Sequence, residues 1–103
     1  MDRISIGELD NFIGIYFGQD YDLFEPSDEV EPKIAQYIKD SHKGNHHALV
    51  ADIDLFLSEC TDIEKDFKER YKHEFVPANW NTTAKEFLYL VHKTVSNHLK
   101  SQS

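Results

Sequence analysis

Apolar residues recur at helical spacing in five stretches of the chain, and the first stretch covers residues 6–17. Its apolar positions are three or four residues apart, which places them on one face of a helix. They are Ile6, Leu9, Phe12, Ile13, Tyr16 and Phe17. Ser5 and Glu8 have the spacing of a capping box at the start of this stretch, and Gly18 offers a left-handed stop at its end. The pattern predicts a first helix over about residues 6–17.

Four further stretches predict helices in the same way. We expect them from residue 27 or 28 to about 41, from about 46 to 60, from 61 to about 71, and from 83 to about 99. The start of the second is indicated by Pro32 in its first turn, and that of the fourth by a second capping box, Thr61-Asp62-Ile63-Glu64. The expected buried positions are Val30, Ile34, Tyr37 and Ile38; Leu49, Val50, Ile53, Phe56, Leu57 and Cys60; Ile63, Phe67, Arg70 and Tyr71; and Phe87, Leu88, Val91, Val95 and Leu99. In the third helix, Asp52, Asp54 and Glu59 are expected to face outward.

Two stretches, residues 18–26 and 73–81, lack periodicity and are rich in turn-forming residues. Each carries aromatic residues outside a helical stripe, namely Tyr21, Phe24 and Trp80, which either anchor an interface or plug a loop onto the helices. No stretch alternates apolar and polar residues as a half-buried strand does. The sequence therefore predicts an all-α, single-domain bundle of about five helices with two irregular loops, formed by residues 1–103.

The charge of the chain is distributed unevenly. The formal net charge is −8, and residues 1–31 carry nine acids against Arg3, whereas residues 32–103 carry ten acids and ten bases. Six of the nine acids lie between Asp20 and Glu31 without a base among them. Charges this close act as a group at a Debye length of about 8 Å in physiological salt. Such a patch repels nucleic acid and attracts a basic surface, although acidic loops can also serve solubility alone.

Catalytic and metal-binding chemistry find little support in the sequence. His42 and His46 are four residues apart, but Gly44 and Asn45 lie between them, so we expect no metal site and no cofactor. Cys60 is the only cysteine, lies on an apolar stripe and is expected to be a small buried residue rather than a nucleophile. The absence of a second cysteine excludes an intrachain disulfide and favours a reducing compartment. With no secretion signal and no apolar window long enough to span a membrane, we expect a cytoplasmic protein without enzymatic activity and without a membrane partner.

The run from Leu9 to Asp22 resembles the opening of one family of immunity proteins from bacterial contact-dependent growth inhibition (CDI) systems. The shared pattern is an aromatic-rich first helix that ends in Tyr-Phe-x-Gln-Asp and is followed by an aromatic residue, here Tyr21. The length of the chain, the acidic segment before Pro26 and Ser27, the apolar third helix and the late Phe87-Leu88 helix are also similar to that family. The resemblance implies a cytoplasmic protein that binds the C-terminal toxin domain delivered by a neighbouring cell, usually blocking a nuclease active site.

An acidic surface suits such a partner, because nucleases that grip phosphates carry basic clefts. The resemblance transfers no contact residue, so the choice of site is made on charge, with one aromatic anchor. We expect the toxin to bind Asp20, Tyr21, Asp22, Glu25, Asp28, Glu29 and Glu31. An alternative is a small adaptor or regulatory module whose helical groove takes a partner helix, with the acids serving solubility.

Overall fold

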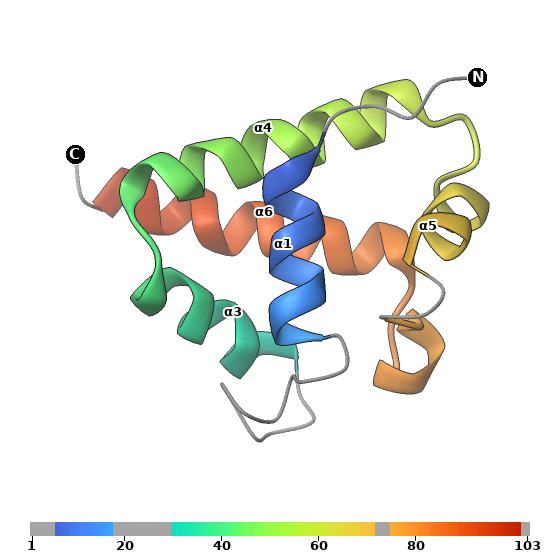
Figure 1. The fold of residues 1–103 in the computed structure, drawn as a ribbon, viewed down its shortest axis with the longest axis horizontal. Coiled ribbons are helices and arrows are strands. Elements are labelled where there is room, and N and C mark those ends of the chain that lie inside the picture. Colours follow the sequence, from blue (N-terminus) through green and yellow to red (C-terminus); the bar gives the residue numbers. More distant parts are fainter. Residues whose placement is uncertain (1–5, 18–29, 72–74, 102–103) are drawn as a thin grey trace.

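The computed structural model describes residues 6–17, 30–71 and 75–101, and within these ranges it is helical, without a strand (Figure 1). The elements are α1 (Gly7–Tyr16), α3 (Val30–Asp40), α4 (Lys43–Glu59), α5 (Ile63–Tyr71), the 3₁₀ helix η1 (Pro77–Trp80) and α6 (Ala84–Ser101). The five α-helices fall where the apolar periodicity predicts them, so the all-α bundle is confirmed.

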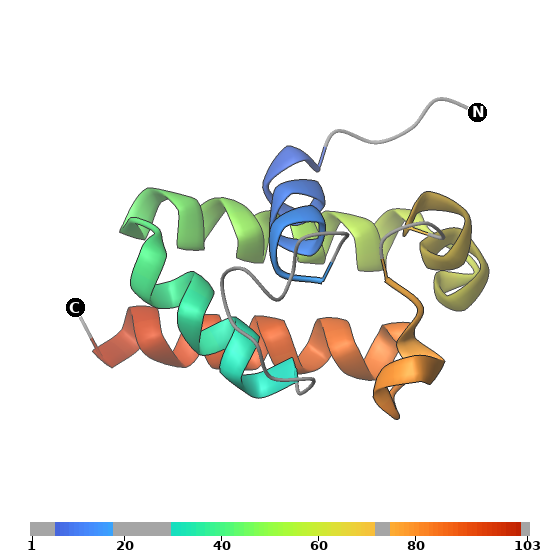
Figure 2. The same cartoon turned by 60° about the horizontal axis from the view of Figure 1, so that its bottom comes forward.

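The two longest helices, α4 and α6, lie side by side and run in opposite directions (Figures 1 and 2). α1 packs across α4, and α3 contacts both α6 and α1. α5 packs against α6 at the end of the bundle where α6 begins. As a result, α1 and α3 lie next to each other although 13 residues, 17–29, separate them in sequence.

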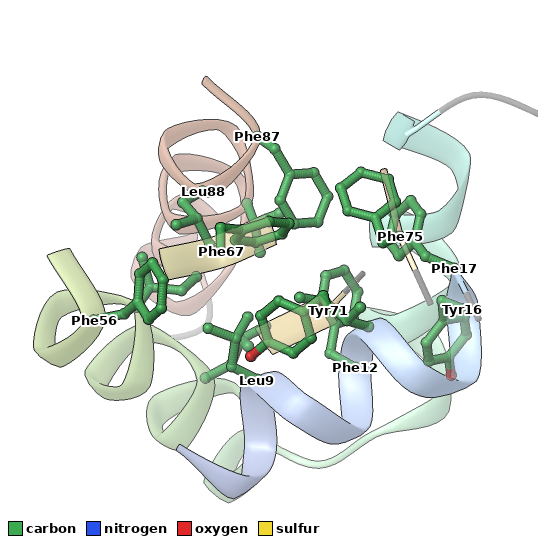
Figure 3. Packing of buried hydrophobic residues seen from close by; sticks show 14 of the residues in the cluster. Leu9, Phe12, Tyr16, Phe17, Phe56, Phe67, Tyr71, Phe75, Phe87 and Leu88 are labelled. Atoms are coloured by element: carbon green, nitrogen blue, oxygen red, sulfur yellow. The ribbon is translucent and has the colours of Figure 1, made fainter. Parts of the chain in front are cut away.

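Aromatic rings fill the centre of the bundle (Figure 3). The Phe87 side chain of α6 is 0% exposed, and its ring centre lies 4.6 Å from that of Phe75 and 5.2 Å from that of Phe17. Phe12 of α1 and Phe67 of α5 contact the same ring from other sides. Rings at these spacings and tilts add to the stability gained by burying their area. One side chain of α6 therefore joins α1, α5 and the segment that precedes η1.

The expected apolar stripes are buried as the sequence predicts. All six apolar positions of the first stretch are at most 5% exposed, and so are the central positions of the other helices. Val30, Ile38, Val50, Leu57, Cys60, Ile63 and Leu99 lie at the edge of this core and are partly buried. Arg70, which lies on the same stripe as Phe67, is largely buried and pairs with an acid of α1.

The start of α4 differs from the prediction. The helix begins at Lys43 rather than after Asn45, so that Gly44 and Asn45 belong to its first turn. The backbone N–H of His42 donates to Oδ1 of Asn45 at 3.1 Å, which satisfies one of the groups that a helix start leaves open. The link between α3 and α4 is consequently only two residues long, and it holds the end of α3 close to the start of α4.

Two helices are capped by carboxylates from other helices, which the local sequence does not reveal. Asp52 of α4 accepts hydrogen bonds from the backbone N–H groups of Glu8 and Leu9, at 2.9 and 3.1 Å. Glu64 of α5 likewise accepts from the N–H groups of Ala84 and Lys85, at 2.9 and 3.0 Å. Both carboxylates meet the positive end of a helix dipole and its unpaired donors.

These contacts correct two expectations. Asp52 does not face outward but is half-buried against α1. Glu64 does not complete a capping box with Thr61, because both of its oxygens serve α6; Asp62 caps α5 instead, accepting from the N–H of Lys65 at 3.2 Å. The predicted box of Ser5 and Glu8 involves a residue outside the described part of the chain, and Glu8 directs its carboxylate to α3 and α4.

The second irregular stretch is built around η1. Pro77 starts this short helix, and Asn81 ends it with a left-handed φ of 58°. Trp80 is half-buried, with its ring centre 5.2 Å from that of Phe17 and 5.7 Å from that of Phe75. Trp80 therefore plugs its loop onto the bundle. The first irregular stretch, with Tyr21 and Phe24, lies outside the described residues.

Candidate functional site

Of the seven residues predicted as the binding site, the structure describes Glu31. It is exposed in the first turn of α3. The others, Asp20, Tyr21, Asp22, Glu25, Asp28 and Glu29, lie outside the described residues. The acidic segment that contains them connects α1 to α3, so these two helices carry its ends.

A pocket of about 260 Å³ opens between α1, α3 and the start of α4. It is lined by Glu8, Asn11, Phe12, Ile15, Tyr16, Tyr37, Asp40, Ser41, His42 and Asn45. Two carboxylates, two phenols and two carboxamides are thus gathered in one hollow, together with the exposed side chain of Ile15. The short link between α3 and α4 brings the last four of these residues to the pocket.

The carboxylate of Glu8 is held on one side of this pocket by neutral donors. The hydroxyl of Tyr37 donates to its Oε2 at 2.9 Å and lies 3.0 Å from the carbonyl oxygen of Asn45. The side-chain amide of Asn45 donates to Oε1 at 3.3 Å. α1, α3 and α4 therefore meet at Glu8, and the orientation of its carboxylate is fixed.

The carboxylate of Asp40 is held in a similar way at the end of α3. Tyr16 of α1 donates its hydroxyl proton to Oδ2 at 2.9 Å, and Gln36, one turn earlier in α3, donates to Oδ1 at 2.8 Å. Asp40 is exposed, whereas Tyr16 is buried. A carboxylate has about four acceptor positions, so Asp40 keeps acceptor capacity for a further donor.

Burial raises the pKa of both phenols in the pocket well above that of free tyrosine, and the neighbouring carboxylates raise it further: Asp40 for Tyr16 and Glu8 for Tyr37. The two tyrosines consequently remain protonated donors at neutral pH and cannot act as bases. The negative charge of the pocket belongs to Glu8 and Asp40.

Asp10, which is next to the pocket-lining residue Asn11 on α1, is a carboxylate that pairs with a basic residue. Arg70 of α5 donates to it from Nε and Nη2, each at 2.8 Å. In the part of the chain that the structure describes, neither Glu8 nor Asp40 forms an ion pair with a basic residue. The pocket therefore concentrates negative charge that the described residues do not neutralise.

His46 lies behind the pocket, next to the α3–α4 link. It is 2% exposed, and its Nε2 is 3.0 Å from the hydroxyl oxygen of Ser41. Burial lowers the pKa of this imidazole, and the nearby ring of His98 lowers it further. His46 is thus a neutral packing residue at neutral pH rather than a charged group facing a ligand.

Cys60 is poorly suited to act as a nucleophile. Cys60 is half-buried at the end of α4, and burial together with Asp66 raises its thiol pKa to about 11. A nucleophilic cysteine needs a lowered pKa, because the thiolate is the reactive form.

Among the described residues, no three His, Cys, Asp or Glu side chains come together as a metal site would require. Within the same ranges, no helix is long and apolar enough to cross a membrane.

The pocket could not be recognised in the sequence, because each of its residues, considered alone, is explained by a role in the helices. Tyr16 and Tyr37 lie on apolar stripes, Glu8 has capping-box spacing, and Asp40 marks a helix end. One signal was available: a buried tyrosine usually needs a partner for its hydroxyl. Two tyrosines on core stripes therefore predict nearby acceptors, though not which ones.

Comparison with known proteins gives one family match. The model of a family described as "CdiI immunity protein" matches residues 5–95. This range includes all six helical elements except the last turns of α6. No curated protein and no solved structure matched the chain.

Proposed function

The chain belongs to the CdiI immunity protein family, and we propose that it neutralises its toxin by placing an acidic surface against a basic, nuclease-type cleft. The family match over residues 5–95 carries the immunity function itself. The distribution of charge supports the finer proposal about how the toxin is recognised.

The structure divides the acids of the N-terminal part into two groups. Glu8 and Asp10 are engaged with other helices of the bundle, whereas Glu31, the one described member of the acidic segment, is exposed. We therefore propose that the acidic segment supplies the negative charge that contacts the toxin. A nuclease cleft that binds phosphates is lined by lysine and arginine, and opposite charge on the inhibitor both fits that cleft and speeds association.

We propose that the toxin contacts seven residues, six of them acidic and one aromatic. They are Asp20, Tyr21, Asp22, Glu25, Asp28, Glu29 and Glu31. In this arrangement Tyr21 is the apolar anchor, because aromatic residues surrounded by charge are frequent hot spots of protein interfaces. The protein then acts in the cytoplasm by binding alone, without a cofactor or a catalytic step of its own.

A charge-reversal experiment tests this proposal. The variant with Asp22→Lys, Glu25→Lys and Glu29→Lys should keep its helical content but bind the cognate toxin domain more slowly and far more weakly. A matched control reverses Asp54, Glu59 and Glu69, which are exposed acids of α4 and α5, and changes the net charge by the same amount. It should bind nearly as well as the parent protein.

Unchanged affinity of the first variant contradicts the acidic-surface proposal and leaves the family assignment intact. Weak dependence of binding on salt, together with sensitivity to exposed apolar substitutions, would instead favour the adaptor type of interface.

A further inference from the structure

We propose that the pocket between α1, α3 and the start of α4 receives an arginine side chain of the toxin. This inference rests on the proposed function and adds a second contact to it, outside the acidic segment. It assigns the recognition of one basic residue to Glu8 and Asp40.

The charge of the pocket is the first reason. Two carboxylates are held in fixed orientations by tyrosine and carboxamide donors, which are neutral and leave the negative charge in place. Asp10 on the same helix has its guanidinium from Arg70 at 2.8 Å, whereas within the described residues Glu8 and Asp40 have no such partner. In the proposal, a cation of the toxin supplies the missing charge.

The size of the pocket selects a side chain rather than a larger ligand. Pockets for drug-sized molecules are usually about 300–1,000 Å³. The present pocket, at about 260 Å³, lies below that range and is open to the surface at exposed residues of α1, α3 and the link between α3 and α4. A single long side chain that enters from a partner protein matches both its volume and its openness.

The kind and placement of lining groups favour arginine over lysine. The two carboxylates come from different helices and line the pocket together with two carboxamides, so acceptors face a cation in the pocket from different directions and several donors are needed to meet them. A guanidinium offers five such donors in a planar fork and packs against aromatic rings, whereas an ammonium is a compact point charge. Tyr16 and Tyr37 line the pocket but are only 5% and 3% exposed, so the apolar surface for the aliphatic stem comes from Ile15, which is 42% exposed.

Chain connectivity relates one side of the pocket to the proposed acidic contact surface. Tyr16, in the last turn of α1, is four residues before Asp20, where the acidic segment begins, whereas Asp40 is at the far end of α3, nine residues after Glu31. On this ground we place the pocket and the acidic segment in one proposed interface.

A pair of matched variants tests the inference against the purified cognate toxin domain. Ile15→Lys places a cation at the rim of the pocket, and Leu55→Lys makes the same change at a similarly exposed apolar residue of α4, which does not line the pocket. Asp40→Asn removes one pocket charge but keeps an acceptor for Tyr16. Circular dichroism and thermal unfolding verify that each variant is folded.

We expect Ile15→Lys and Asp40→Asn each to raise the dissociation constant at least tenfold, and Leu55→Lys to change it less than threefold. Replacing toxin arginines singly by alanine should then identify one whose loss is not additive with Asp40→Asn, which is the signature of direct contact.

Three results would overturn the inference. The first is an equal effect of both lysine substitutions, which would mean that net charge alone matters. The second is unchanged affinity of Asp40→Asn and Ile15→Lys while the toxin is still inhibited. The third is coupling of Asp40 to a lysine and to no arginine. Failure of the parent protein to bind the toxin contradicts the proposed function as well, so the two failures are distinguishable.

Discussion

The carboxylate of Asp10 and the guanidinium of Arg70 form a two-point ion pair across 60 residues of sequence, with both nitrogen–oxygen distances at 2.8 Å. The hydroxyl of Tyr71 donates to the same carboxylate at 2.7 Å. The pair joins α1 to α5, two helices whose core residues Phe12 and Phe67 both contact the ring of Phe87 in α6. One acid of the strongly acidic N-terminal part is therefore part of the scaffold.

Removing this pair should destabilise the fold. Asp10→Ala leaves the guanidinium of Arg70, whose side chain is 11% exposed, without its carboxylate. We expect the free energy of unfolding to fall by about 1.5–2 kcal/mol, the lower end for hydrogen bonds to charged groups, because Asp10 itself is partly exposed. Urea unfolding followed by circular dichroism measures the loss. Glu69→Ala, which removes an exposed acid next to Arg70, should change the stability by less than about 0.5 kcal/mol.

Because Asp52 caps α1, its removal should destabilise the fold more than the removal of its neighbour Asp54. Asp52→Ala removes the acceptor of two backbone N–H groups, and loss of a helix cap usually costs about 0.5–2 kcal/mol. Asp54→Ala, two residues later on the same helix, removes an exposed carboxylate that pairs with His92 at the surface and should cost much less. Similar thermal stabilities of the two variants would show that the cap contributes nothing beyond a surface charge.

The buried imidazole of His46 predicts a pH dependence of stability. Burial and His98 lower its pKa in the folded protein, and a backbone hydrogen bond with Ile38 and the charge of Glu8 act in the opposite direction. Below about pH 6.5 the unfolded chain takes up a proton on this histidine while the folded chain does not. The free energy of unfolding should therefore decrease as the pH falls from about 7.5 to 5.5, by at most about 1.4 kcal/mol per pH unit from this group.

Neighbouring variants isolate the contribution of His46. His46→Gln removes the titrating group and should flatten the dependence over that pH range. His47→Gln, at the adjacent exposed position, should retain the slope of the parent protein. A steep slope that persists in His46→Gln would assign the effect to other residues.

Cys60 should react slowly with thiol reagents in the folded state. Its pKa of about 11 leaves very little thiolate near neutral pH, and the side chain is half-buried. At about pH 8, alkylation by iodoacetamide should be more than tenfold slower than that of a free cysteine, whose pKa is about 8.5. The difference should disappear in denaturant. Rapid alkylation of the native protein would contradict the packing of Cys60 described above.

The sequence predicted the helices well because their information is local. Apolar residues at spacings of three and four identify the face that must be buried, and Gly18, Pro32 and Thr83 mark where helices can begin or end. Thr83 does cap α6, since its hydroxyl oxygen accepts from the N–H of Glu86 at 3.1 Å. The all-α class and the core stripes followed from these signals alone.

The polar pairings could not be read from the sequence because they join distant residues. Nothing near Asp52 indicates that it caps a helix more than 40 residues earlier, nor does the surrounding sequence of Glu64 indicate its bond to the start of α6. The pocket has the same origin, since Glu8 and Asp40 come to line one pocket only after α1 packs beside α3. Charge counting predicts an acidic surface but not which acids the fold uses.

The most direct measurement is a calorimetric titration of this protein with its cognate toxin domain, at two salt concentrations, beside an assay of nuclease activity. Tight binding that weakens at the higher salt and abolishes cleavage is the predicted result, because an acidic surface on a basic cleft loses attraction as salt screens it. Binding that is indifferent to salt, or that leaves cleavage intact, would contradict the proposed acidic block of a nuclease cleft.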